Sequence, residues 1–235
     1  MVRIYPGLLS KVGLTPLHRN MSFENFVINK RNKKVYEISK EYSSNPEGFL
    51  YLYGKPGCGK THLTVSILKS LHPVRYPKNV LAEKERQLRD MIEYYEMIKG
   101  MKEEAERNRE FFENGQWQFR PAKALFLKSF HYTTEISSYA GYEAKSKMDY
   151  INSLMNYDCI ALDDFGMENF TDSVKHYFYM LIDEFYTGRK PMIITSNRSI
   201  VEINKIIPGI ASRLAEGMII HLDDIDHRIN KERNQ

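Results

Sequence analysis

The sequence predicts an α/β fold in which a parallel sheet is flanked by helices, and three observations carry this prediction. Short apolar runs alternate with segments of helical periodicity, the first run leads into a Gly-rich loop, and later runs end in polar side chains. Such alternation is typical of parallel sheets with crossover helices, and ligands bind at the carboxyl ends of their strands. The expected strands occupy about residues 49–53, 123–130, 158–163, 191–195 and 217–222.

The first strand leads into a phosphate-binding loop. Residues 54–61 read Gly-Lys-Pro-Gly-Cys-Gly-Lys-Thr, which matches G-x-x-x-x-G-K-[ST], and a helical pattern follows. The glycines let the backbone approach an anion, Lys60 would reach the β- and γ-phosphates, and Thr61 would complete a Mg²⁺ shell. A Gly-rich turn with a chance Lys-Thr is the alternative, which the flanking strand and helix disfavour. The expected nucleotide-binding residues are Gly54, Lys55, Pro56, Gly57, Cys58, Gly59, Lys60, Thr61 and His62.

A long charged insertion separates the loop helix from the second strand. It covers residues 72–120, and its middle part, 81–113, lacks Pro and is expected to form one or two helices, with Gly100 as a hinge or turn. Its apolar residues form a narrow stripe with charged flanks: Leu88, Met91, Tyr95, Ile98, Ala105 and Phe112. The stripe either packs back on the core or belongs to an arm that binds a partner.

Polar residues at two strand ends are the candidates for catalysis. Asp163 is placed to hold Mg²⁺, and Asp164 would act as general base toward the attacking water, although it could instead only cap the next turn. After a helical pattern over 172–188, the next strand ends at Asn197, which could sense the γ-phosphate or help place water. Thr195 is a less favoured candidate for that role, and a strand end followed by a helix cap is the alternative.

Arg213 lies on a short helical pattern just before the last strand. A lone Arg on a helix is usually a surface residue. In this order of motifs we interpret it as an arginine finger that reaches the nucleotide of a neighbouring subunit, so self-association is expected. The elements together indicate an ATPase with ATP and Mg²⁺ as its ligands.

Composition narrows the class of protein further. The chain has 235 residues, 42% hydrophobic, with 16 Tyr and 12 Phe, and this excludes disorder throughout. No apolar run approaches the ~20 residues of a membrane span, and no signal peptide is evident. Cys58 and Cys159 are interpreted as reduced thiols of a cytoplasmic protein. The net charge of +4 permits nucleic-acid binding without requiring it.

The segment 13–26 carries a specific resemblance. Its sequence, G-L-T-P-L-H-R-N-M-S-F-E-N-F, resembles the G-x-x-P-L-H-x-N-x-S-F-E-N-[YF] lead-in of the DnaC-type replicative helicase loaders. The loop, the segments 163–166 and 195–197, and the Arg213 region are similar to the same family, within the AAA+ group that includes the IstB-type transposition ATPases. The resemblance covers about Gly13 to Arg228 with one large interruption, and Arg228 is a weak match to a late nucleotide-sensing element.

This resemblance implies a function and a set of partners. It implies an AAA+ (ASCE) core that hydrolyses ATP between subunits, slowly without DNA or partner, assembles on single-stranded DNA and delivers a hexameric helicase. The alternatives are an IstB-type transposition regulator and a non-hydrolysing nucleotide-gated adaptor. The segment after the second strand would face the central channel, which makes Lys128, Tyr132 and Lys145 candidate DNA contacts, with ordinary helix surface as the alternative. His18 would frame the adenine pocket or only pack locally.

The expected organisation is a single AAA+ domain, 1–235, with a lead-in over 1–47 and the insertion 72–120 within it. Only about a dozen residues precede the lead-in, too few for the helicase-binding domain that loaders usually carry there. The insertion is therefore the candidate for contact with a helicase or a neighbouring subunit. No C-terminal lid domain is expected, because only residues 223–235 follow the last strand.

Overall fold

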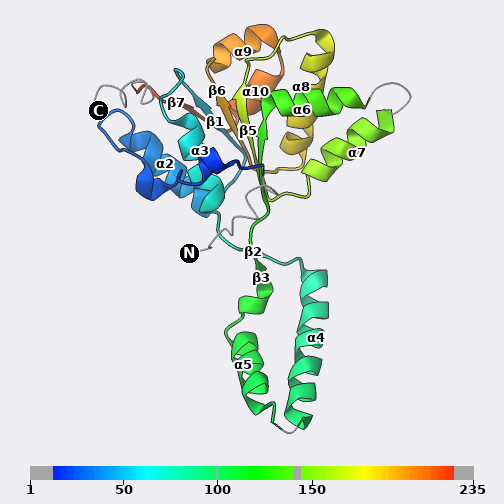
Figure 1. The fold of residues 1–235 in the computed structure, drawn as a ribbon. Coiled ribbons are helices and arrows are strands. Elements are labelled where there is room, and N and C mark those ends of the chain that lie inside the picture. The colour runs from blue at the N-terminus through cyan, green and yellow to red at the C-terminus, as the bar shows by residue number, and fades with distance from the viewer. Residues whose placement is uncertain (1–12, 99, 140–143, 225–235) are drawn as a thin grey trace. The chain divides into compact units, whose positions relative to one another are not determined.

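The computed structural model describes residues 13–98, 100–139 and 144–224 (Figure 1). Its contacts divide the chain into two compact units, one formed by Met1–Leu71 and Lys123–Gln235 and the other by His72–Ala122. The second unit coincides with the charged insertion to within two residues. None of the helices in the described ranges is long and apolar enough to cross a membrane.

The first unit is built on a five-stranded sheet, which confirms the predicted fold class. All strand pairs are parallel and the order is β4-β5-β6-β1-β7. The strands are β1 (Phe49–Tyr53), β4 (Ala124–Lys128), β5 (Cys159–Phe165), β6 (Met192–Ser196) and β7 (Met218–His221), each within a few residues of its predicted bounds. β1, β5 and β6 are almost wholly buried, as expected for central strands of a sheet covered on both faces.

Helices cover both faces of this sheet (Figure 1). One face carries α2 (Lys33–Ser44) and α3 (Lys60–Lys69), and the other carries α8 (Asp172–Thr187) with its neighbours α6 (Ser129–Ser138), α7 (Ala144–Leu154) and α10 (Ile210–Ala215). The remaining helices of this unit are α9 (Ile200–Ile206) and the 3₁₀ turns η2 (Pro16–His18) and η3 (Phe23–Asn25). Among the described residues, no helix follows β7.

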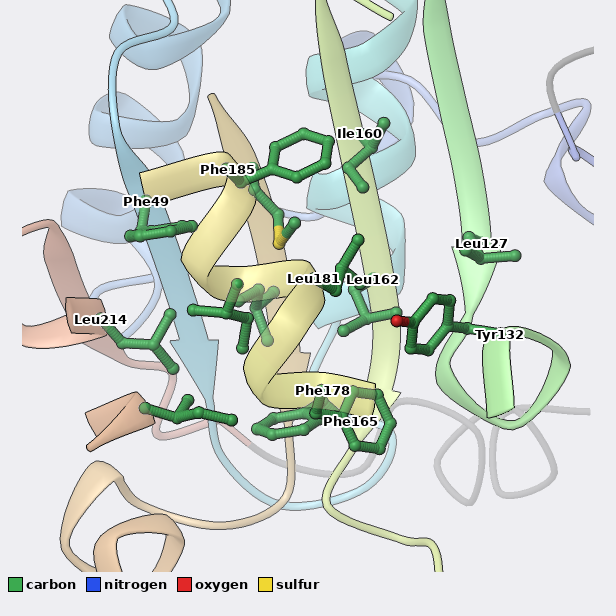
Figure 2. Packing of buried hydrophobic residues seen from close by; sticks show 14 of the residues in the cluster. Phe49, Leu127, Tyr132, Ile160, Leu162, Phe165, Phe178, Leu181, Phe185 and Leu214 are labelled. Carbon is green, nitrogen blue, oxygen red and sulfur yellow. The ribbon is translucent and has the colours of Figure 1, made fainter. Parts of the chain in front are cut away.

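The core on the α8 face fixes this helix to the sheet. Phe178, Leu181 and Phe185 on one face of α8 are fully buried and belong to the same cluster as Ile160 and Leu162 of β5 (Figure 2). Full burial of such side chains contributes about 1.5–3 kcal/mol each relative to exposure. This packing holds β5 and β6 rigidly side by side, so the residues at their carboxyl ends have fixed positions.

Polar contacts to α3 hold the lead-in segment. The ammonium of Lys69 donates to three backbone carbonyls, those of His18 (2.6 Å), Met21 (2.8 Å) and Arg19 (2.9 Å). Burial lowers the pKa of Lys69, and its three donors are all used. One side chain thus anchors a stretch whose described regular elements are the two 3₁₀ turns η2 and η3.

We expect Lys69→Met to destabilise the protein. The substitution keeps most of the apolar stem but leaves the half-buried carbonyls without a donor, which should lower the free energy of unfolding by about 1–3 kcal/mol. Urea denaturation followed by circular dichroism measures this. Lys34→Met, on the exposed face of α2, is the matched control. Equal effects of the two variants would contradict the anchoring role.

The second unit is a helical hairpin. α4 (Lys78–Met97) and α5 (Lys102–Glu113) pack together, and the short strands β2 (Val74–Arg75) and β3 (Phe119–Arg120) pair antiparallel, with the 3₁₀ turn η4 (Gln116–Gln118) before β3. Gly100 has φ +95° and lies in the turn between the helices, so it is a turn residue. Leu88 and Ala105 of the predicted stripe are buried, so the stripe serves to pack the hairpin itself, a use that the sequence analysis did not consider.

Candidate nucleotide-binding site

The loop between β1 and α3 requires its glycines. Gly57 and Gly59 have φ of +76° and +103°, a region that side chains with a Cβ rarely adopt. A Cβ on Gly54 would lie 2.3 Å from the Leu222 carbonyl oxygen, and one on Gly59 would lie 2.9 Å from the Phe26 ring. The loop is therefore pressed against the end of β7 and the lead-in, with its backbone free to face the pocket.

Lys60 is buried and joins the loop to β6. Its ammonium donates to the Gly54 carbonyl (2.8 Å), the Lys55 carbonyl (2.9 Å) and Asn197 Oδ1 (2.9 Å), and only 6% of the residue is exposed. The structure thus brings Asn197 against the loop lysine. A phosphate bound in the loop would exchange these neutral acceptors for charged ones, which bind an ammonium more strongly.

Asp163 lies at the centre of the site. Its carboxylate accepts from the Thr61 hydroxyl (3.0 Å) and the Thr195 hydroxyl (2.7 Å), and it is 1% exposed. Burial raises the pKa of Asp163, and the neighbouring Asp164 charge adds to this, while the two hydroxyl bonds and Lys128 oppose it. Thr61 and Asp163 present oxygen ligands side by side, and this chemistry fits Mg²⁺, which takes few protein ligands and completes its shell with phosphates and water.

Asp164 occupies a strained position beside it. Pairing between β5 and β6 shifts register between Leu162 and Phe165, a bulge of the kind that re-aims side chains, and Asp164 has φ +62°. Its backbone N–H donates to Thr195 Oγ1 (3.0 Å), and its half-exposed carboxylate lies 3.6 Å from the Lys128 ammonium.

Thr195 thus contacts both aspartates, donating to the Asp163 carboxylate and accepting from the Asp164 backbone N–H. The sequence analysis ranked it below Asn197.

A pocket of about 750 Å³ is lined by Lys60, Thr61, Asp163, Asp164 and Asn197, among others. The sequence analysis did not identify four of the residues that line it, which come from three separate segments: Met21, Phe130, and Met167 with Glu168. Phe130 and Met167 are 66% and 62% exposed, which makes an apolar rim at the mouth. Only the unusual exposure of these side chains identifies them, and no spacing in the sequence predicts it.

Arg213 lies away from this pocket, in a groove beside the start of β1. Its guanidinium donates to Asp183 (2.8 Å), the Gly209 carbonyl (3.0 Å) and the Tyr179 hydroxyl (2.8 Å). It also lies 4.7 Å from the centre of the Tyr179 ring. A finger that acts on another subunit must lie outside its own site, so this position agrees with the sequence interpretation without testing it.

Two of the three predicted DNA contacts, Lys128 and Tyr132, have described side chains, and these differ in burial. Tyr132 is fully buried and its hydroxyl donates to the Tyr177 carbonyl (2.7 Å), so the prediction that it stacks on a base is wrong. The side chain belongs to the core because it faces α8, which periodicity alone did not reveal. Lys128 lines the nucleotide pocket beside Asp164. The side chain of Lys145, like Arg228, lies outside the described part of the chain.

His18 has a structural role. It is 3% exposed, its Nδ1 is 3.0 Å from the Thr15 backbone nitrogen, and its ring lies 4.8 Å from that of Phe126. Burial lowers the pKa of His18, and the Lys128 and Lys69 charges lower it further, which keeps it neutral. Both cysteines are buried, and burial raises the pKa of Cys159 to about 12, so this thiol is unreactive.

A parallel sheet of order β4-β5-β6-β1-β7, with a phosphate-binding loop after β1 and an acidic bulge at the end of β5, is the fold of AAA+ P-loop domains. Residues 17–114 match the family model of the bacterial DnaA ATPase domain. The chromosomal replication initiator protein DnaA of onion yellows phytoplasma is 24% identical over 222 residues, which cover 89% of this chain and 33% of that protein. DnaA of Kosmotoga olearia is 24% identical over 229 residues, which cover 94% of this chain and 39% of the relative.

Two solved structures illustrate the likeness in fold. Domain III of the Thermotoga maritima replication initiation protein DnaA has a TM-score of 0.62 at 18% identity, covering 93% of this chain and 73% of that one. The crystal structure of the DnaC helicase loader has a TM-score of 0.56 at 18% identity, covering 88% and 98%. The chain therefore has the fold of AAA+ P-loop domains and is similar in sequence to the DnaA ATPase domain, and it spans about a third to two fifths of the length of the curated relatives above. The sequence matches name DnaA, whereas the sequence analysis pointed to DnaC-type loaders, which occur among the structural neighbours.

We expect Asp163→Asn to stabilise the protein without nucleotide while weakening binding of Mg·ATP at least tenfold. Asn accepts the Thr61 and Thr195 bonds without a buried charge. Because the folded-state pKa of Asp163 is raised, its contribution to stability is best at acidic pH and is lost as the pH rises through that pKa. The melting temperature of the variant should therefore exceed that of wild type increasingly from about pH 4 toward neutrality. A constant or reversed difference would contradict the assignment.

Thr195→Val should distinguish a role in positioning the two aspartates from a role in binding ATP. Loss of the hydroxyl releases the Asp164 backbone and one bond to Asp163, so we expect kcat for ATP hydrolysis to fall about 10–100-fold with ATP affinity changed less than threefold. Thr195→Ser, which keeps the hydroxyl, is the control. Steady-state kinetics and nucleotide titration measure the two quantities, and a loss confined to affinity would refute the positioning role.

Proposed function

We propose that this protein is an ATP-dependent DNA-replication ATPase of the helicase-loader type. In this proposal, it binds and hydrolyses ATP between subunits, assembles on single-stranded DNA and delivers a hexameric replicative helicase in the bacterial cytoplasm. The observation that carries the proposal is the convergence of Lys60, Thr61 and Asp163 in one pocket, with Asp164 at its side. The lead-in 13–26 and the likeness in fold to the DnaC loader support the loader class.

The residues divide the chemistry among them. The loop amides and Lys60 bind the triphosphate, and Thr61 and Asp163 hold Mg²⁺, which neutralises charge on the phosphates when bound. Asp164 accepts a proton from the attacking water, because its half-exposed carboxylate faces the pocket. Asn197 positions Lys60 and the terminal phosphate, and Arg213 of a neighbouring subunit completes the site. Turnover is therefore slow until subunits assemble.

A replication initiator related to DnaA is the second candidate. The family match over 17–114 and the DnaA relatives favour it, and one DnaA structure with a likeness in fold is described as bound to AMPPCP and single-stranded DNA. Both candidates use the same ATPase core. Binding to a purified helicase favours the loader, and sequence-specific binding to duplex DNA favours the initiator. An IstB-type regulator would instead bind a transposase.

The decisive experiment is ATP hydrolysis with and without single-stranded DNA, with oligomer mass recorded in each nucleotide state. We expect DNA-stimulated turnover and ATP-dependent assembly for wild type, and at least tenfold slower turnover for Asp164→Asn and Arg213→Ala. Asp172→Asn and Arg107→Ala, both at exposed positions, are the matched controls. Binding of ATP without turnover under any condition would refute the catalytic roles and favour a nucleotide-gated adaptor.

Mixing the Asp164→Asn and Arg213→Ala variants tests whether Arg213 acts on a neighbouring subunit. Asp164→Asn retains its finger and Arg213→Ala retains its own pocket, so a mixture should regain part of the wild-type rate if the finger acts between subunits. No recovery in a mixture that assembles normally would contradict that assignment.

A further inference from the structure

The hairpin unit carries a three-layer stack that its own packing does not explain. The Arg89 guanidinium lies 4.6 Å from the centre of the Phe112 ring, and that ring stacks on Trp117 with the centres 5.6 Å apart and the planes within 1°. The Trp117 indole also donates to the Phe112 carbonyl (3.1 Å), which fixes its orientation. An indole held in this way presents a rigid flat surface at low cost in side-chain entropy.

A groove of about 320 Å³ opens beside this indole. Its lining is mostly aromatic and apolar: Tyr76, Lys84, Gln87, Leu88, Met91, Phe111, Trp117 and Phe119. Phe111 and Phe119 are 40% and 48% exposed, so their ring surfaces face solvent. Leu88 is already buried in the hairpin core, whereas the two Phe residues contribute little to that core.

The charged residue that lines the groove is basic. In the described part of this unit, Lys84 is the only charged residue that lines it, and its ammonium lies 4.4 Å from the centre of the Tyr76 ring. Arg75, next to Tyr76, is held in place by its bond to Gln118 (2.7 Å). Glu83, beside Lys84 in sequence, is engaged by Arg86 and Gln87.

Open aromatic faces combined with fixed cations fit one class of ligand. A base stacks on an aromatic ring irrespective of its sequence, and Lys or Arg beside the ring meets the backbone phosphates. A protein partner would find neither a long apolar groove for a helix nor a free strand edge wide enough for β-addition, since β2 and β3 have two residues each and pair with each other.

We propose that this groove binds single-stranded nucleic acid, with a base stacked among Trp117, Phe119 and Tyr76 and with Lys84 and Arg75 at the phosphates. This binding site lies outside the nucleotide pocket and needs no ATP. The proposed function includes binding to single-stranded DNA, and this groove is the site of that binding. The proposal about the groove does not depend on ATP hydrolysis.

Trp117 makes the proposal directly testable because it is the one tryptophan of the sequence. Titration of the full-length protein with a short oligodeoxythymidylate, in the absence of nucleotide and Mg²⁺, should quench its fluorescence to saturation, with an affinity that falls as salt rises. An abasic oligomer of equal length should bind about tenfold more weakly and leave the fluorescence unchanged, because phosphates without bases cannot stack.

Variants of exposed residues separate the groove from the rest of the surface. We expect Phe119→Ala and Lys84→Ala each to weaken binding of the oligomer about tenfold. Tyr94→Ala on α4 and Lys102→Ala on α5, both outside the groove, are the matched controls and should bind like wild type. Unchanged circular dichroism and melting temperature show that each variant is folded.

The outcomes are separable from those of the ATPase experiment. Lys60→Ala, which disables the nucleotide loop, should leave the quenching of Trp117 intact. Oligomer binding without quenching, or binding that the groove and control variants weaken equally, would overturn the proposal. Quenching by a protein partner but not by the oligomer would overturn it as well and would identify the groove as a protein-docking site.

Discussion

The site depends on one buried carboxylate. Asp163 accepts hydroxyl bonds from Thr61 at the start of α3 and from Thr195 on β6, while it lies itself at the bulged end of β5. Three elements distant in sequence therefore meet at one carboxylate. Because the burial of a charge costs free energy unless partners compensate, this arrangement persists only while the surrounding core holds the elements in register.

That core is provided mainly by residues without a chemical role. The α8 cluster locks β5 beside β6, and the Lys69 and loop-glycine contacts hold the lead-in and β7 around α3. This rigid packing maintains the strained backbone of Asp164. It also keeps the Asp163 carboxylate buried, and this burial raises its pKa. The strained backbone and the buried charge make the folded protein less stable than its packing alone would make it. The same arrangement orients the carboxylates before any ligand binds.

The two units use aromatic residues differently. In the first, Tyr132 and Phe178 fill the core, and in the second, Phe111 and Phe119 remain exposed around a groove. Both Tyr132 and Phe119 occur near basic residues in the sequence, and the sequence analysis singled out only Tyr132. Which ring is buried depends on whether another helix covers it, and this depends on contacts between segments far apart along the chain.

The sequence alone determined the α/β fold, the strand positions, the phosphate-binding loop and the two Asp residues, because each depends on a local pattern of apolar, glycine and polar residues. Local patterns also predicted one or two helices within 81–113, with Gly100 as a hinge or turn. Only the tertiary structure decided that Thr195 bonds both the Asp163 carboxylate and the Asp164 backbone, that Lys128 lies beside Asp164, that Tyr132 belongs to the core and that Trp117 borders a groove. These facts depend on the strand order β4-β5-β6-β1-β7 and on helix packing, since the residues concerned are brought together by long-range contacts that no spacing along the chain encodes.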